Sequence, residues 1–452
     1  MPPRPELRLN APNHLAPDDT LGSNGRMPSA RSKKKATAPH LVEPQLKYVT
    51  DATFKEFHAA ISRGFQEAPR PELLELDRQV FQNERMFGFK VGRRWVSTCG
   101  DFERRLTVPG GAAVPTAAVT VVTVHAPYRR RGLLTAMMKH QLEQVAKRGE
   151  PLAALWASES LIYGRYGYGP ASTRAVLKGT NRRLSFLPGV KTTGSVDEVT
   201  REEFQRVAPG LHNAMRPDRP GTMVRDKDVW EFAIFDMEFA RRGASEIRYV
   251  LHYDEAGDAD GFATYRFKEN FDEEPEGDVR IKEVWAEDPT AYASLWRYLL
   301  DLDLARTFHW WSAPVDEPLR HLVTDARAVG TSLTDNLYVR IVDVQAALEA
   351  RKYAAGVDLV IEVDDPILPE NTGRYRIITD GNPEGSSAQV TRATSAPDIS
   401  MGVLELGSIY LGGLHLKDLY RVSRVAEHST GAIAAASTAF GWHRSPWCPD
   451  MF

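Results

Sequence analysis

The chain has 452 residues, of which 42% are hydrophobic and 26% charged, and its formal net charge is -3. This length is expected to divide into two or three globular domains. The charge gives no general attraction to nucleic acid or anionic membrane, two cysteines exclude a disulfide framework or zinc cluster, and no apolar run is long enough to span a bilayer.

Residues 1–45 are rich in proline, asparagine, serine and charge, and they carry few large apolar side chains. Such a segment buries too little surface to offset its chain entropy, so we expect a disordered leader. Its basic run at 33–35 is either part of a solvated tail or a patch for a partner. Because an apolar signal-peptide core is missing, we expect a cytoplasmic protein, with export without a signal left open.

Ordered structure is expected to begin near Leu46. Thr50 or Asp51 can cap a first helix, whose inner face would carry Phe54, Phe57, Ile61 and Phe65. Two strands are predicted next, at 88–91 and 95–98.

A buried strand is predicted at 119–124, where every residue is β-branched. A basic loop with a glycine, 129–132, follows, and then a helical pattern that Gly149 would end; its apolar face is Leu134, Met137, Met138, Leu142 and Val145. Helix N-termini have unpaired N–H groups and glycine allows close approach, so this layout can hold phosphates. Taken alone, the loop fits a basic surface loop better.

The residues that follow favour the phosphate-binding interpretation of this loop over a basic surface loop. A strand at 152–156 is followed by Ser158, Glu159 and a segment rich in tyrosine and glycine, 162–170. This order resembles the GNAT superfamily of acetyl-CoA-dependent N-acetyltransferases, and more narrowly the Eis (enhanced intracellular survival) aminoglycoside acetyltransferases. The resemblance covers most of the chain beyond about the first forty residues, and it also rests on 106–110, 337–344, 347–351 and the terminal segment 445–452.

The resemblance implies an acetyl-CoA site and no metal. The basic loop would hold the pyrophosphate, and Tyr163 would protonate the leaving thiolate as general acid. On local sequence alone Tyr163 fits a core aromatic, and Glu159 fits a first-turn acid of a helix. Backbone N–H groups of Val122 and Val124 can bind the acetyl carbonyl and pantetheine if the strand is splayed there. The cofactor residues implied are Val122, Thr123, Val124, Arg129, Arg130, Arg131, Gly132, Leu133, Leu134, Thr135, Ser158 and Glu159.

The final segment, 445–452, is apolar at four positions and contains two prolines. Mobile tails are generally polar, so we expect this one to be docked. In the Eis family the free carboxylate of a terminal Phe acts as the base, and Phe452 matches it. The usual pKa of such a carboxylate, about 3.3–3.7, is low for a base, so burial must raise the pKa or water must relay the proton.

The substrate residues implied by the resemblance are Phe65, Glu67 and Asp316, and Asp450, close to the chain end, is expected to add negative charge near the cavity. They would bind a small polyamine such as an aminoglycoside, acetylated at one or several positions. The alternatives are core packing for Phe65, a solvated loop for Glu67 and a simple turn residue for Asp316. His125 and His140 have no partner pattern and are interpreted as structural or surface residues.

After Pro170 the pattern repeats in degraded form. A helix is predicted at 229–241, strands at 247–253, 262–267 and 279–286, a helix at 291–302 and a strand at 307–312. The loop before the second of these helices, 287–290, carries two acids and no glycine, and acids at a helix N-terminus would repel a pyrophosphate. We infer a second GNAT-like domain that lacks a cofactor site.

From about Asn336 a third unit begins, with a short helix at 345–352, strands at 359–363 and 374–378, apolar stretches at 400–406 and 408–411, and a helix from Leu416. This layout resembles a sterol-carrier-protein-like α/β domain. The expected chain is α+β: leader 1–45, catalytic GNAT domain 46–185 and second GNAT-like domain 186–335, each a mixed sheet flanked by helices, then the third domain 336–452. The resemblance implies a homohexamer, with no nucleic acid and no membrane partner.

Three functions compete at this point. The first is acetyl transfer to aminoglycosides or other polyamines. The second is a protein or peptide lysine N-acetyltransferase, and the third is a non-catalytic regulatory protein that binds CoA. Tyr163 together with the apolar tail weighs against the third.

Overall fold

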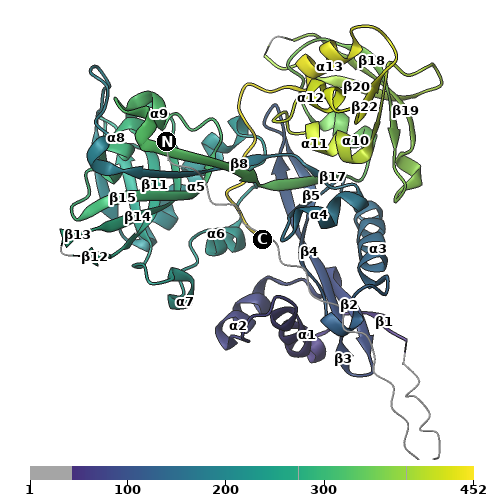
Figure 1. Cartoon of the computed structure of the whole chain (residues 1–452), viewed down its shortest axis with the longest axis horizontal. Helices are drawn as coiled ribbons and strands as arrows, with labels where there is room; N and C mark the ends of the chain where they lie inside the picture. Colours follow the sequence, from purple (N-terminus) through teal and green to yellow (C-terminus); the bar gives the residue numbers. More distant parts are fainter. Residues whose placement is uncertain (1–42, 273, 383) are drawn as a thin grey trace, which may run out of the picture. The chain divides into compact units, whose positions relative to one another are not determined.

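The computed structural model describes residues 43–452, apart from 273 and 383, so residues 1–42 of the predicted leader lie outside the described part. Pro44–Phe452 form one compact unit, which contains three large sheets and their helices (Figure 1). Its first strand, β1 Gln45–Tyr48, begins close to the predicted start of order. In the described residues no helix is long and apolar enough to cross a membrane.

The first sheet has the order β1-β2-β4-β5-β6-β17-β7, and β3 pairs with β2. The predicted strand at 95–98 is interrupted at Val96, and the predicted strand at 119–124 is the second half of a longer strand. The members after β1 are β2 Met86–Val91, β3 Arg94–Trp95, β4 Ser97–Thr107, β5 Ala113–Val124, β6 Leu152–Trp156, β7 Gly169–Pro170 and β17 Leu337–Ile341.

Helices cover both faces of this sheet. Thr50 caps the first helix as predicted, whereas Phe65 lies beyond the helix end and is 44% exposed, so its predicted place on the inner face is wrong. Helix α1 (Asp51–Gly64) packs with Ala118 of β5, and helix α3 (Leu133–Lys147) packs with Ala117 and Val119. The two helices lie on opposite faces of the sheet, because successive strand residues point to opposite sides. The helices are α1 Asp51–Gly64, α2 Pro71–Val80, α3 Leu133–Lys147 and α4 Ser160–Tyr163.

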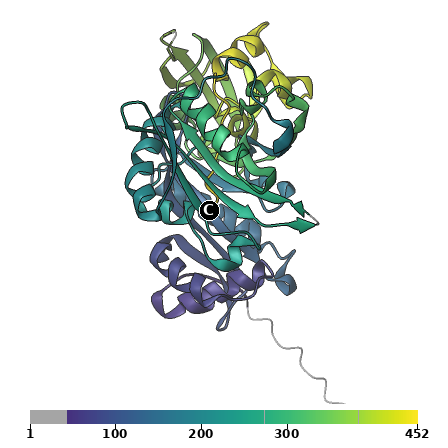
Figure 2. The same ribbon diagram turned by 90° about the vertical axis from the view of Figure 1, so that its left-hand side faces the viewer.

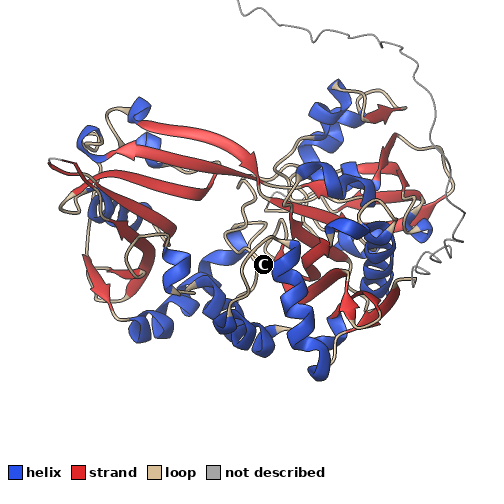
Figure 3. Cartoon of the chain, turned by 60° about the horizontal axis from the view of Figure 1, so that its bottom comes forward, coloured by secondary structure: helices blue, strands red, loops and turns tan. Residues whose placement is uncertain are grey.

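The second sheet has the order β16-β8-β15-β14-β11-β10-β9 (Figure 3). Its strands are β8 Thr173–Thr180, β9 Ser195–Val199, β10 Arg248–Tyr253, β11 Ala259–Lys268, β14 Gly277–Ala286, β15 Ala305–Pro314 and β16 Val329–Asp335. A separate hairpin joins β12 Phe271–Asp272 to β13 Glu274–Pro275. The helices are α5 Arg201–Met215, α6 Lys227–Ala233, α7 Glu238–Arg241, α8 Pro289–Leu300 and α9 Leu319–Leu322.

The single helix predicted at 229–241 is wrong, because α6 ends at Ala233 and α7 starts at Glu238. Between them, Asp236 accepts hydrogen bonds from Arg266, from Arg241 and from the backbone N–H of Ile247. This tertiary contact holds the connecting backbone outside a helix, and local periodicity contains no sign of it.

Sheet membership departs from the predicted domain ranges at two strands. β8 precedes residue 186 but belongs to the second sheet, and β17 follows residue 335 but belongs to the first. The chain crosses between the sheets at Ser172 and again at Asn336, where the Ser172 hydroxyl lies 2.8 Å from the Asn336 side-chain oxygen and the Asn336 N–H donates to the Ser172 carbonyl at 3.1 Å. Two antiparallel crossings therefore join the first two domains.

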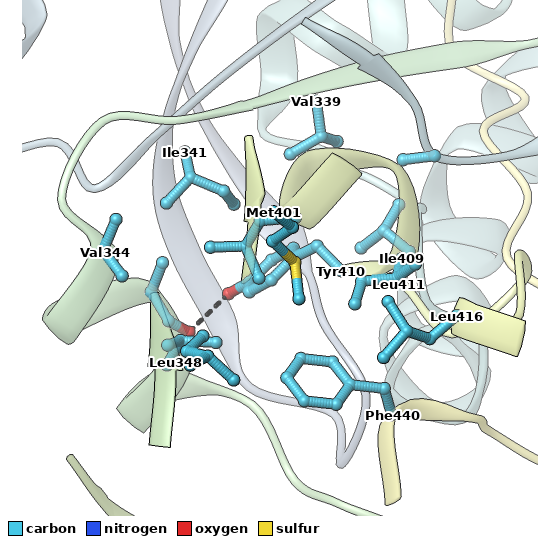
Figure 4. Packing of buried hydrophobic residues seen from close by; sticks show 14 of the residues in the cluster. Val339, Ile341, Val344, Leu348, Met401, Ile409, Tyr410, Leu411, Leu416 and Phe440 are labelled. Carbon is cyan, nitrogen blue, oxygen red and sulfur yellow. Dashed lines mark hydrogen bonds between the residues drawn. The ribbon is translucent and has the colours of Figure 1, made fainter. Parts of the chain in front are cut away.

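The third sheet has the order β20-β19-β18-β21-β22. A buried cluster joins this domain to β17, and in it the Tyr410 hydroxyl donates to the Ala347 carbonyl at 2.8 Å (Figure 4). A fully buried ion pair, Arg340 with Asp365 at 2.7 Å, makes the same connection. The elements are β18 Asp358–Asp364, β19 Gly373–Thr379, β20 Ala388–Ala393, β21 Ile399–Gly402, β22 Val425–Glu427, α10 Val344–Ala350, α11 Val403–Ile409, α12 Leu416–Arg421 and α13 Ala432–Phe440.

Candidate active site

The first sheet opens between β5 and β6. These strands pair in parallel only from Thr116 to Ala118 of β5, so in the described chain the remainder of β5 has no strand partner on that side. On the other side the β4–β5 register shifts near Thr98, and Val121 has a φ of +49°, a bulge that redirects the strand. The Thr98 hydroxyl donates to the Val121 carbonyl at 2.6 Å and holds the bulge. This geometry supplies the splayed strand that the expected role of the Val122 and Val124 N–H groups requires.

The basic loop leads from this opening into α3. Gly132 occupies the N-cap position of α3 with a φ of +79°, no side chain caps the helix, and no acid lies in its first turn. A Cβ at Gly132 would meet no atom within 4 Å, so the space beside the helix N-terminus is open. Arg129, Arg130 and Arg131 are all exposed, and Arg129 donates to the Val124 carbonyl at 3.1 Å. This donor set fits a pyrophosphate.

The other expected cofactor residues divide by exposure. Thr123 and Leu133 are buried, and the Thr123 hydroxyl lies 2.7 Å from that of Thr98, so only their backbone groups are available to a ligand. The Thr135 hydroxyl lies 3.2 Å from that of Tyr166. Leu134 is partly buried. Ser158 and Glu159 are exposed just before α4, and Glu159 is its N-cap residue rather than a first-turn acid.

Tyr163 ends α4 and is 5% exposed. It packs in one cluster with Val119 of β5, Leu155 of β6 and Met138 of α3, beyond the last β5–β6 pair. Burial raises the pKa of Tyr163 above its ordinary value, so its hydroxyl keeps its proton at neutral pH. This is the protonation state that a general acid needs.

A cavity of about 640 Å³ lies on the α1 side of the opening, between the first domain, the second domain and the tail. Of the expected substrate residues, Phe65, Glu67 and Asp450 line it, and so do Phe452 and two residues of β5, Thr120 and Val121. The remaining lining residues are Asp77, Phe81, Phe102, Arg104, Met223, Arg225, Val229, Phe232, Ala233, Phe235, Lys282, Glu283, Trp311, Ser312, Pro449 and Met451.

Asp316 does not line this cavity. Its carboxylate pairs with Arg219 at 2.6 Å and accepts the backbone N–H of Ser445 at 3.1 Å, so it anchors the start of the tail instead. Sequence reasoning missed Glu283 and Lys282, which come from β14 of the second domain. The two residues are adjacent, and the β11–β14 register shifts at Lys282, a bulge that alternation along the sequence does not predict.

The tail is docked, as predicted. Trp447 is 2% exposed within the second domain's core cluster, whereas its neighbour Cys448 belongs to the cluster of the first and third domains. Asn336, at the crossing between the sheets, accepts the Cys448 N–H at 2.9 Å and donates to the Cys448 carbonyl at 3.0 Å. A Cβ at Gly221 would come within 2.9 Å of the Trp447 backbone nitrogen, so the close approach of the tail to residue 221 requires a glycine there.

Phe452 and Tyr163 approach the opening from opposite faces of the first sheet. Phe452 packs against the α1-side cluster, which contains Ala118, whereas Tyr163 lies in the α3-side cluster, which contains Ala117. In Figures 1 and 3 the C-terminal label lies between the first and second sheets, and in Figure 2 it lies near the middle of the molecule. Tyr163 and Phe452 thus flank the opening between β5 and β6.

The equivalent loop of the second domain is closed to an anion. Asp288 caps α8 and accepts hydrogen bonds from the N–H groups of Thr290 at 2.6 Å and Ala291 at 3.0 Å. These bonds lower the pKa of Asp288 below its ordinary value. The α8 N–H groups that correspond to the uncapped ones at the N-terminus of α3 are therefore already satisfied by a negative charge.

Calorimetric titration with acetyl-CoA is therefore expected to give one site per chain, at the N-terminus of α3. Gly132→Asp should abolish that site, because it places a negative charge beside the free N–H groups and a side chain on a backbone whose φ of +79° favours glycine. Asp288→Gly should leave the stoichiometry at one. A second site per chain in the unaltered protein would contradict the assignment.

Comparison with known proteins bears on the same segments. The Acetyltransferase (GNAT) domain family matches residues 45–171 and a second GNAT domain family matches residues 221–341, while the Sterol carrier protein domain family matches residues 344–449. N-acetyltransferase Eis of Mycobacterium tuberculosis is 35% identical over 345 residues, which are 74% of this chain and 80% of that protein. The chain belongs to the Eis family of GNAT N-acetyltransferases.

Two further proteins extend this Eis relationship. An uncharacterized N-acetyltransferase of Streptomyces coelicolor is 39% identical over 405 residues, 88% of this chain and 96% of its own. The crystal structure of Eis1 from Mycobacterium abscessus is 31% identical, with a TM-score of 0.79, and the match covers 90% of this chain and all of that one. Two GNAT domains followed by a sterol-carrier-like domain, predicted from the sequence, are thereby confirmed.

Proposed function

We propose that this Eis-family chain transfers the acetyl group of acetyl-CoA to a primary amine of an aminoglycoside or another polyamine. The observation that supports this most is one cavity lined both by the end of the tail and by the splayed part of β5. Such a cavity brings an amine, a carboxylate and the mouth of the acetyl-CoA site together. The proposal takes Phe452, the last residue of the sequence, as the bearer of the free carboxylate.

The chemistry divides among three groups of this chain. The carboxylate of Phe452 removes a proton from the acceptor ammonium, directly or through water. The freed amine attacks the acetyl carbonyl carbon and forms the C–N bond; of the backbone N–H groups of Val122 and Val124, one stabilises the oxyanion on the carbonyl oxygen and the other binds pantetheine. The Tyr163 hydroxyl then donates its proton to the departing sulfur. Acetyl-CoA supplies the activated thioester.

The charges of the cavity favour a second class of acceptor beside polycations. Arg225 pairs with Asp450 at 2.8 Å and with Glu283 at 2.7 Å, so the buried triad keeps a single net negative charge when both acids are ionised, and Asp316 lies elsewhere. Glu67 is left as an exposed acid, and most other lining residues are aromatic or aliphatic. An amine on an aromatic or aliphatic body would bury its apolar part there.

A panel of acceptors tests the function, with release of CoA thiol as the readout. It should contain aminoglycosides, linear polyamines, arylalkylamines and lysine peptides, each with its acetylated product identified by mass spectrometry. Turnover with small amines and none with peptides would support the proposal. Turnover confined to lysine peptides would favour a protein acetyltransferase, and binding of acetyl-CoA without any turnover would favour a regulatory protein.

We also propose, from the family resemblance, that the chain assembles into a homohexamer. Multi-angle light scattering at micromolar concentration is expected to give six times the 50.5 kDa chain mass. A monomeric mass would contradict this assembly.

A further inference from the structure

The tail residue that hydrogen bonds anchor nearest to Phe452 is Asp450. Its carboxylate receives the Arg225 Nε–H at 2.8 Å, and its backbone carbonyl accepts the indole N–H of Trp156 at 2.9 Å. Asp450 is 9% exposed, whereas the next residue, Met451, is 64% exposed. The position of Phe452 therefore depends on how Asp450 is held.

Arg225 is the centre of a buried ion triad. It is 4% exposed, it donates from Nε to Asp450 and from Nη2 to Glu283, and its guanidinium lies 4.7 Å from the ring centre of Trp230. Glu283 also accepts the indole N–H of Trp285 at 2.9 Å, which fixes its own orientation. Burial raises the pKa of Asp450 and the charge of Arg225 opposes this effect, so the guanidinium favours the ionised, hydrogen-bonded form of Asp450.

The triad and Trp156 together join the parts that make up the cavity. Trp156 belongs to β6 of the first sheet, Glu283 to β14 of the second, and Asp450 to the tail. Phe452 follows Asp450 by two residues, a reach of about 7 Å at most in extended chain. An anchor at Asp450 thus sets where the terminal carboxylate can lie relative to the opening in β5.

We propose that Arg225 is a positioning residue, which holds the terminal carboxylate of Phe452 at the acceptor amine through its ion pair with Asp450. This inference rests on the proposed role of that carboxylate as base. Arg225 itself does not exchange protons with the amine. Its second partner, Glu283, ties this anchor to the second domain.

The test uses full-length protein with Asp450→Asn, which keeps the volume and removes the charge. We expect kcat to fall roughly 10- to 100-fold, since a displacement of about 1 Å can have such an effect, while the Kd of acetyl-CoA and the KM of the amine stay within about twofold. Carboxypeptidase A should release Phe452 faster than from the unaltered protein, as followed by mass spectrometry. Arg225→Lys should retain more kcat than Arg225→Met, because a lysine can still pair with Asp450.

A matched control is Asp358→Asn, which removes the carboxylate of the Arg376 pair in the third domain, at 2.6 Å. Its kcat and its carboxypeptidase sensitivity should equal those of the unaltered protein. If Asp450→Asn and Arg225→Met, verified as folded, keep kcat while deletion of Phe452 abolishes it, the positioning role is overturned and the base survives. If deletion of Phe452 also leaves kcat unchanged, the base assignment fails as well.

Discussion

Tyr163→Phe is expected to lower kcat roughly 10²–10⁴-fold, the range for loss of a general acid, while the Kd of acetyl-CoA stays nearly unchanged. The substitution removes one hydroxyl and keeps the ring, which packs at 6.1 Å from the ring of Tyr168. Because burial raises the pKa of Tyr163, the lost group is a protonated donor throughout the neutral range. Steady-state release of thiol and calorimetry measure the two quantities.

Tyr168→Phe is the matched control for this change. Tyr168 is also a buried tyrosine of the same cluster, but its hydroxyl donates to Gln141 at 3.3 Å on α3, away from the opening. Its loss should reduce the free energy of unfolding by about 1 kcal/mol and leave kcat as it was. Near-normal turnover of a folded Tyr163→Phe protein would rule out the acid assignment.

Local patterns predicted the elements around the basic loop, but not helix α2, the greater part of β4 or the first half of β5. β6 lies at 152–156, as its apolar run indicated, and α3 begins just after Gly132. What local patterns could not give is sheet membership. β8 and β17 look like ordinary strands, and their placement in the second and first sheets depends on the crossings at Ser172 and Asn336. Helix α5 was not predicted; it contains Pro209, a residue that usually breaks a helix.

The candidate site was predictable where the chain itself carries the chemistry. The docked tail followed from its apolar residues, and Gly132 from its place before a helix. The sequence does not predict the opening between β5 and β6, because strand pairing depends on the neighbouring strands. From the sequence, a splayed strand is therefore only a requirement for the role of the Val122 and Val124 N–H groups. The charge of the cavity was missed for the same reason. Asp450 and Asp316 are acids in the sequence, but Arg225 and Arg219, far away along the chain, pair with them.

Removing or blocking the terminal carboxylate should have the other large effect. Deletion of Phe452 leaves the carboxylate of Met451 up to about 3.6 Å of chain short of its place, and a C-terminal tag moves the charge away and adds bulk to the cavity. Both should lower kcat at least as strongly as Asp450→Asn, because they move the carboxylate along the chain itself, whereas Asp450→Asn only loosens its anchor. Binding of acetyl-CoA should persist, since the phosphate loop lies at 129–132. Thiol release and calorimetry again provide the readouts.

The most direct test of the base assignment replaces the carboxylate of Phe452 by a carboxamide, through ligation of a synthetic tail. The amide keeps the ring, the chain length and the anchor at Asp450, so only the charge and the basicity change. If the carboxylate is the base, the amidated protein should be nearly as slow as the deletion variant. If the tail serves only to pack the three domains together, the amidated protein should turn over normally, and a deletion variant should lose activity only in proportion to its loss of folded protein. The two accounts therefore separate on one measurement, the kcat of folded, amidated chain.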